Sequence, residues 1–134
     1  MNRKKIISAV QQICDDRELA FRVVDRDSLS AHTPALPAAV LVTPEFERIE
    51  GRSRGRITYK VEMYLFEKGM HNSPEQQAEQ LAQMESVMLD IFTQLSENEN
   101  VALVDKLQMD AVTSRLLARA EIGLKATAEV VVIF

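Results

Sequence analysis

The stretch that most constrains the fold is residues 57–66, which read ITYKVEMYLF. Every second residue is apolar: Ile57, Tyr59, Val61, Met63 and Leu65. Successive side chains of a strand point to opposite faces, so this period of two predicts a strand with one face in the core. The other face is polar at first and ends with Tyr64 and Phe66. We expect these two rings to be partly exposed and to contact another chain.

The next constraint is a capped helix. Ser73, Pro74 and Gln76 match a capping box, with the serine as N-cap and proline in the first turn. Apolar residues then recur at helical spacing on one face: Ala78, Leu81, Met84, Met88, Ile91, Phe92 and Leu95. The pattern predicts a helix over 74–95 whose apolar face packs on the strand face of Tyr59, Val61 and Met63.

The remaining elements follow from shorter patterns. A first helix is expected after Asn2, as N-cap, with Ile6, Ile7, Val10, Ile13 and Cys14 on its apolar face. Strands are expected at 20–25, 38–43, 101–110 and from 122 to the end of the chain. Pro44 is expected to end the second strand, and 44–55 to connect it to the third as a hairpin. Residues 111–120 are ambiguous between a turn, a short helix and an irregular crossing.

This order predicts an α+β fold. It consists of one mixed, largely antiparallel sheet of four to five strands with two helices on one face, in the order α-β-β-β-α-β-β. The 134 residues have an ordinary globular composition and are expected to form one domain, 1–134. A net charge of −4 argues against a dedicated nucleic-acid binder. The N-terminal stretch turns polar before a secretory apolar run forms, and no segment suits a membrane.

The sequence contains no pattern that indicates catalysis. Its four glycines form neither a phosphate loop nor a dinucleotide fingerprint. His32 and His71 lack ligand-like spacing to the single cysteine, Cys14, which is expected to be a buried apolar residue. We therefore predict no enzyme activity, no catalytic, cofactor-binding or metal-binding residue, and no cofactor.

One loop is suggestive. Arg52, Arg54 and Arg56 lie in GRSRGR, between the predicted second and third strands. The loop is either a solvated hairpin tip, balanced by nearby glutamates, or a contact to phosphate or to a protein partner when several copies gather. Arginine forks suit phosphate oxygens and carboxylates equally well.

Taken together, the order of the elements resembles the tail-terminator (tail-completion, minor tail) proteins of long-tailed bacteriophages. The matching stretches are RKKIISAVQQIC, LPAAVLVTP, RITYKVEMYLFEK, SPEQQAEQLAQMESVMLDIFTQL and EIGLKATAEVVVIF. The resemblance implies a non-enzymatic ring of six copies that caps the tail tube and joins it to the head connector. It also implies that the protein is in the virion tail, or in the host cytoplasm during assembly. Its partners would be further copies of itself, tail-tube and head-connector proteins and possibly DNA passing through the ring, with no membrane.

Two other classes remain open. One is a stand-alone adaptor with the same sheet that binds a ligand or protein without forming a ring. The other is a small nucleic-acid-associated protein that uses the arginine loop 51–56. Mass in solution separates the ring from the adaptor, and salt-dependent DNA binding separates the third class from both.

Overall fold

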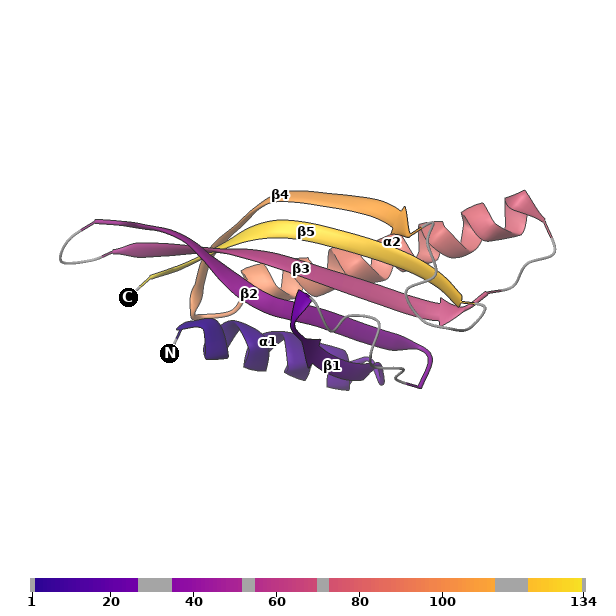
Figure 1. Cartoon of the computed structure of the whole chain (residues 1–134), viewed down its shortest axis with the longest axis horizontal. Helices are drawn as coiled ribbons and strands as arrows, with labels where there is room; N and C mark the ends of the chain where they lie inside the picture. Colours follow the sequence, from indigo (N-terminus) through magenta and orange to yellow (C-terminus); the bar gives the residue numbers. More distant parts are fainter. Residues whose placement is uncertain (1, 27–34, 52–54, 70–72, 113–120, 134) are drawn as a thin grey trace.

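The computed structural model of the chain describes residues 2–26, 35–51, 55–69, 73–112 and 121–133. These residues form two helices and one five-stranded sheet (Figure 1). The elements are α1 (Asn2–Asp16), β1 (Ala20–Val24), β2 (Ala38–Glu50), β3 (Arg56–Lys68), α2 (Pro74–Ser96), β4 (Val101–Val112) and β5 (Glu121–Ile133). The predicted α+β class and element order are confirmed.

The sheet has the strand order β1-β2-β3-β5-β4. Only β1 and β2 are parallel; the other neighbours are antiparallel. The predicted hairpin of β2 and β3 is present, with Glu50 opposite Arg56. β5 pairs with β3 along its whole length and with β4 on its other side. The last strand of the chain is therefore an inner strand.

The two helices cover the same face of the sheet, and the main core lies between them and it. The predicted apolar face of α1 is buried except for Ile7, which is half-buried. In α2, Met84, Met88, Ile91 and Phe92 are buried in one cluster with Tyr59, Val61 and Met63, as predicted. Leu81 is only half-buried and lies outside this cluster. The sheet contributes further buried residues: Ala39, Leu41, Leu65, Leu124, Ala126, Ala128, Val130 and Val132.

The start of α2 follows the predicted cap. The backbone amide of Gln76 donates to Ser73 Oγ at 3.2 Å, and Pro74 is in the first turn. This bond satisfies one of the amides that a helix leaves unpaired at its start. The first six residues of α2, 74–79, are all exposed, because the helix begins beyond the end of the sheet (Figure 1).

The prediction that Pro44 ends the second strand is wrong. β2 continues through Pro44 to Glu50, and its register against β3 shifts between Val42 and Glu45. Proline has no N–H to donate, and a bulge is one of the places in a sheet where the ladder tolerates this. β1 ends opposite Val42, so β2 and β3 run on beyond β1 as a long hairpin.

The ambiguous segment 111–120 is partly resolved. Ala111 and Val112 complete β4, and 113–120 lie outside the described residues. β4 pairs with β5 in antiparallel fashion, with a register shift between Asp105 and Gln108. Lys106, within that shift, has the left-handed φ of 54° that such irregularities often require.

Candidate functional site

The arginine loop lies at the tip of the β2–β3 hairpin. Arg52 and Arg54 fall outside the described residues. Arg56 is the first residue of β3, is exposed, and forms no ion pair within the described part of the chain. Arg48, lower on the hairpin, contacts Glu47 at 3.6 Å and Glu50 at 3.0 Å. Of these two described arginines, Arg56 alone is open to a partner.

Tyr64 and Phe66 are buried, not partly exposed as the sequence suggested. Tyr64 is 6% exposed and Phe66 is 1% exposed. Their rings stack at 5.8 Å between centroids, and they form a second apolar cluster with Val24, Val40 and Val42. The correction has a physical cause: β1 and β2 place valines on the same sheet face as the two rings, so the chain covers the rings itself.

Gly123 makes room for this cluster. It pairs with Phe66 across the β3–β5 ladder, and a Cβ there would lie 2.9 Å from Phe66 Cε1. It would also lie 3.1 Å from Cβ of Val112. A glycine inside a strand often marks such a close approach. The ring of Phe66 therefore occupies the space that a side chain at 123 would need.

A buried carboxylate lies beside the second cluster. Glu62 is 4% exposed and accepts hydrogen bonds from Arg26 at 3.1 Å and from the Tyr64 hydroxyl at 3.0 Å. Lys125 Nζ lies 3.7 Å from the same carboxylate. Burial, followed by the hydrogen bond to Glu62, raises the pKa of Tyr64 to about 12. The cluster is fully paired and keeps Tyr64 protonated as a donor.

A second ion cluster lies further along the same face. Glu129 contacts Arg48 at 3.2 Å and Lys106 at 3.3 Å. Burial acts to raise the pKa of Glu129, but the hydrogen bonds and charges of Lys106 and Arg48 outweigh it, so the pKa is lowered. The Arg48 contact ties the β2–β3 hairpin to β5. Both clusters are compensated, which favours a structural role for each.

The hairpin carries an apolar surface that the sequence reasoning missed. Phe46 is 52% exposed and Ile49 is 54% exposed. They face the same side, because they pair with Tyr59 and Ile57, and a register shift after Phe46 adds one residue between them. Tyr59 belongs to the core on the helix-covered face, so Phe46 and Ile49 continue that face beyond the helices. We call residues 45–50 of β2, with 56–60 of β3, the hairpin extension.

The sequence conceals this surface because Pro44 predicts the end of a strand. The segment after it, EFERIE, also lacks regular alternation, since Phe46 and Ile49 are three residues apart. A signal for this surface is nevertheless present in the sequence. Phe46 and Ile49 lie among charged residues, and a strongly alternating strand follows them.

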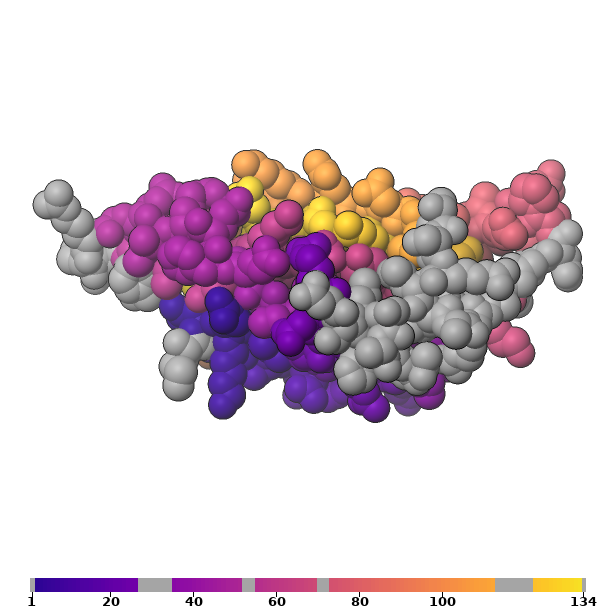
Figure 2. Space-filling view, in the orientation of Figure 1, coloured from indigo at the N-terminus to yellow at the C-terminus, as the bar shows by residue number. Residues whose placement is uncertain are grey.

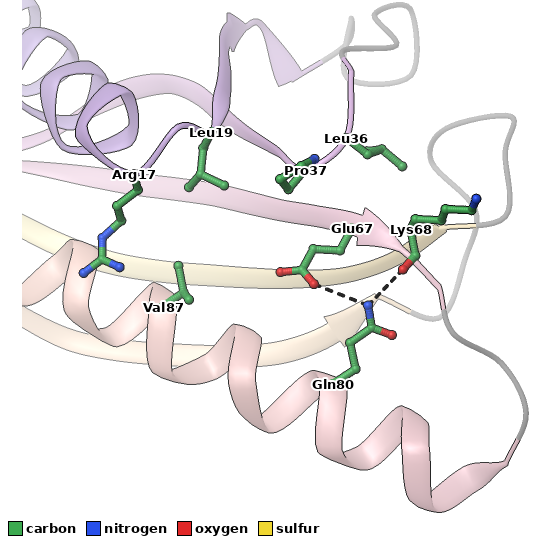
Figure 3. A pocket seen from close by; sticks show the side chains of 8 residues that line it. All are labelled: Arg17, Leu19, Leu36, Pro37, Glu67, Lys68, Gln80 and Val87. Carbon is green, nitrogen blue, oxygen red and sulfur yellow. Dashed lines mark hydrogen bonds between the residues drawn. The ribbon is translucent and has the colours of Figure 1, made fainter.

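A pocket lies at the opposite end of the molecule (Figure 3). It is about 430 Å³ in volume and lies between the end of α1, the start of β2, the end of β3 and the middle of α2. Its apolar lining is Leu19, Leu36, Pro37 and Val87, and its polar lining is Arg17, Glu67, Lys68 and Gln80. We call it the end pocket.

Hydrogen bonds fix the wall of the end pocket. Gln80 Nε2 donates to Glu67 Oε1 at 3.3 Å and to the carbonyl oxygen of Lys68 at 2.9 Å, which joins α2 to the end of β3. Arg17 donates to Asp90 at 3.1 Å. The Nε of Arg17 is buried and has no hydrogen-bond partner within the described residues. The end pocket thus has an apolar lining and a polar wall that is held by hydrogen bonds.

The remaining candidate features are the cysteine, possible metal ligands and possible membrane-spanning helices. Cys14 is buried, and burial followed by the charge of Asp15 raises the pKa of its thiol to about 12. Within the described ranges, no group of three or more His, Cys, Asp or Glu residues is arranged to hold a metal ion. No helix among the described residues is long and apolar enough to cross a membrane.

The chain was compared with known protein families and with curated proteins. No family matches, and no curated protein is similar enough to count as a relative.

Proposed function

We propose that the protein is a structural subunit that acts by assembling with copies of itself, and that it is not an enzyme. The observation that carries the proposal is the apolar face of the hairpin extension. Phe46 and Ile49 lie there more than half exposed, next to the half-buried Ile57.

The hairpin extension exposes apolar side chains to water, which is unfavourable for a monomer. In the body of the sheet, the same face is covered by α1 and α2. In the hairpin extension β3 stays paired with β5, whereas β2, beyond the end of β1, is the edge strand of the sheet. Exposed apolar groups that adjoin one another on a projecting element are typical of protein–protein contacts. A partner that covers this face buries these side chains and stabilises the assembly.

The resemblance to tail-terminator proteins suggests the form of the assembly. It would be a closed ring, of six copies in that family, that caps a tail tube and joins it to a head connector. Such a ring requires heterologous contacts that close on themselves. The hairpin extension supplies one half of a contact of this kind, because it lies at one end of the molecule (Figure 1) and exposes Phe46 and Ile49.

Sedimentation velocity tests this proposal. At tens of micromolar, an interface with a Kd near 1 μM, or about −8 kcal/mol, keeps most of the protein assembled. We expect the wild type to sediment as an oligomer and the double variant Phe46→Ser, Ile49→Ser to shift toward monomer. Leu103→Ser is the matched control, because Leu103 is 47% exposed on β4 and its register across β5 to Thr58 places it on the opposite face of the sheet from Phe46 and Ile49.

The outcomes separate the classes of function. A wild type that remains a folded monomer throughout this range contradicts self-assembly and favours the adaptor class. Ring-shaped particles in electron micrographs, lost in the double variant and kept in the control, support the ring.

One observation favours a nucleic-acid contact as a second candidate. Arg56 is exposed without an ion pair in the described chain, next in sequence to Arg52 and Arg54. In a ring these loops would gather, and each phosphate neutralised would contribute about −0.9 to the slope of log affinity against log salt. DNA binding by assembled wild type, lost on replacing the three arginines by glutamate while assembly is kept, supports this candidate. If this variant assembles but no longer attaches to phage tails, the arginines contact a protein partner instead.

A further inference from the structure

We propose that the hairpin extension of one copy docks into the end pocket of the next, in a contact that rests on the self-assembly proposed above. The occupant of the pocket is thus a second copy of this chain, and the side chains that enter it are Phe46 and Ile49. Acidic side chains at the start of α2 receive the basic start of α1 from the same neighbour.

The donor and the acceptor lie at opposite ends of the long axis. Figure 1 shows the β2–β3 hairpin at one end, together with the N-terminus of α1, and the start of α2 at the other. In Figure 2 the magenta atoms of β2 project at the left and the pink atoms of α2 at the right. One chain cannot place its own hairpin extension in its own end pocket. Contact between two copies is therefore head to tail.

The end pocket suits apolar side chains. Its volume of about 430 Å³ is within the range of pockets that enclose drug-sized molecules, and it exceeds the needs of one or two large side chains. Leu19, Leu36 and Val87 offer apolar contacts.

The charged side chains at the two ends of the molecule are also complementary. The first turn of α1 carries Arg3, Lys4 and Lys5, and no acidic residue. Cations there oppose the helix dipole, typically by about 0.3–1 kcal/mol each at an exposed site. All three are exposed, and none forms an ion pair within the described residues. We call this group the basic end of α1.

The opposite charge is found at the other end of the molecule. Glu75 and Glu79 are exposed on the first turns of α2 and form no ion pair in the described part of the chain. We call them the acidic start of α2. The basic end of α1 in one copy and the acidic start of α2 in the next compensate each other.

On each end, the charged and apolar parts adjoin. At the donor end, the guanidinium of Arg3 lies 5.9 Å from the ring centroid of Tyr59, and that ring contacts Phe46 edge-on at 6.2 Å. At the acceptor end, Gln80 lines the end pocket, and Glu79 lies one position before it in α2, about 100° around the helix axis. A single docking geometry can therefore bring apolar side chains into contact and place cations beside anions. The pocket lining also contains the cations Arg17 and Lys68 and the anion Glu67.

A complementation experiment tests the contact. The donor-deficient chain is Phe46→Ser, Ile49→Ser, and the acceptor-deficient chain is Val87→Arg. Leu89→Arg, on the exposed side of the same helix, is the control for the arginine. We expect each deficient chain to raise the dissociation constant at least about tenfold, or ~1.4 kcal/mol, and the control to leave it unchanged.

Mixing the two deficient chains is the decisive step. A head-to-tail contact leaves one intact donor and one intact acceptor in the mixture, so a one-to-one heterodimer forms that cannot grow further. A mixture that stays monomeric overturns the proposal, because a contact between two identical patches cannot be complemented in this way.

Charge reversal gives a second test that does not touch the core. Lys4→Glu with Lys5→Glu should weaken assembly, and so should Glu75→Lys with Glu79→Lys. Mixed, the two chains should associate as strongly as the wild type at low salt, since the reversed charges again match across the contact.

The outcomes distinguish this inference from the proposed function. A wild type that never assembles overturns self-assembly itself. An assembly that is lost with the donor variant, yet forms normally with Val87→Arg and with Glu75→Lys, Glu79→Lys, leaves self-assembly in place and overturns the end pocket as its acceptor.

Discussion

The buried carboxylate of Glu62 permits a prediction in which burial decides the sign and size of each effect. Its side chain is 4% exposed, whereas its cationic partners Arg26 and Lys125 are 48% and 37% exposed. The cations keep most of their hydration if the carboxylate is removed. The buried carboxylate, in contrast, cannot be hydrated if the cations are removed.

Removing the charge of Glu62 should therefore cost little. In Glu62→Gln the amide oxygen still accepts a hydrogen bond, and the exposed cations return to water. We expect a loss of about 1–2 kcal/mol in the free energy of unfolding, in the range of one hydrogen bond to a charged group. Replacing both cations, in Arg26→Met with Lys125→Met, leaves a buried carboxylate with only the hydroxyl of Tyr64. That change should cost about 3–5 kcal/mol.

The third variant removes the whole cluster. Adding Glu62→Leu to the two methionine substitutions eliminates the uncompensated charge, so we expect about 2 kcal/mol of the loss to be recovered. The remainder reflects the Tyr64 hydroxyl, which then lacks its acceptor. The assay is urea unfolding followed by circular dichroism at one protein concentration, because self-association would add a concentration-dependent contribution. Equal losses for the carboxylate and the cations, or a triple variant less stable than the double one, would refute the reasoning.

Two further predictions concern the core and alkaline pH. Phe92→Ala should lower the unfolding free energy by roughly 3–5 kcal/mol, because Phe92 is only 2% exposed. Leu89→Ala, at a position that is 53% exposed, should lower it by less than about 1 kcal/mol. Similar losses for the two variants in urea titrations would show that α2 is wrongly oriented. Because the pKa of Tyr64 is raised from 10.0 to about 12, the folded state keeps a proton that the unfolded state loses, so stability is full below pH 10 and falls as the pH rises toward 12. In a Cys14→Ala background, which removes a similar decline that begins near pH 9, Tyr64→Phe should flatten this fall by up to about 2.7 kcal/mol, and an unchanged pH profile would contradict the assignment.

The elements of the fold were predictable where a pattern was long and regular. The strict alternation of residues 57–66 and the capped, three-and-four spacing of 74–95 each fixed an element and the face that it buries. The final strand was predictable because its even positions are apolar from Ile122 onward. Its place between β3 and β4 was not, since alternation does not reveal which strands are neighbours.

The candidate site was mostly not predictable, for two physical reasons. Register shifts displaced side chains from simple alternation, which hid the shared face of Phe46 and Ile49. Burial of Tyr64 and Phe66 depends on valines from β1 and β2 and on the missing side chain of Gly123, all remote in sequence. An apolar pair on an otherwise polar strand face does not show whether its cover comes from the same chain or from another.

Irregularities at the two edges of the sheet favour contact through side chains over pairing of sheet edges. β2 beyond β1 contains Pro44, which cannot donate to an added strand, and β4 contains Lys106 with its left-handed φ of 54° inside a register shift. Each break interrupts the row of donors and acceptors that a new strand would need. A partner strand laid along either edge would leave ladder groups unpaired, at a cost of about 1–3 kcal/mol for each buried one. The hairpin extension avoids this cost, because its apolar side chains project from the face of the sheet and need only a pocket to receive them.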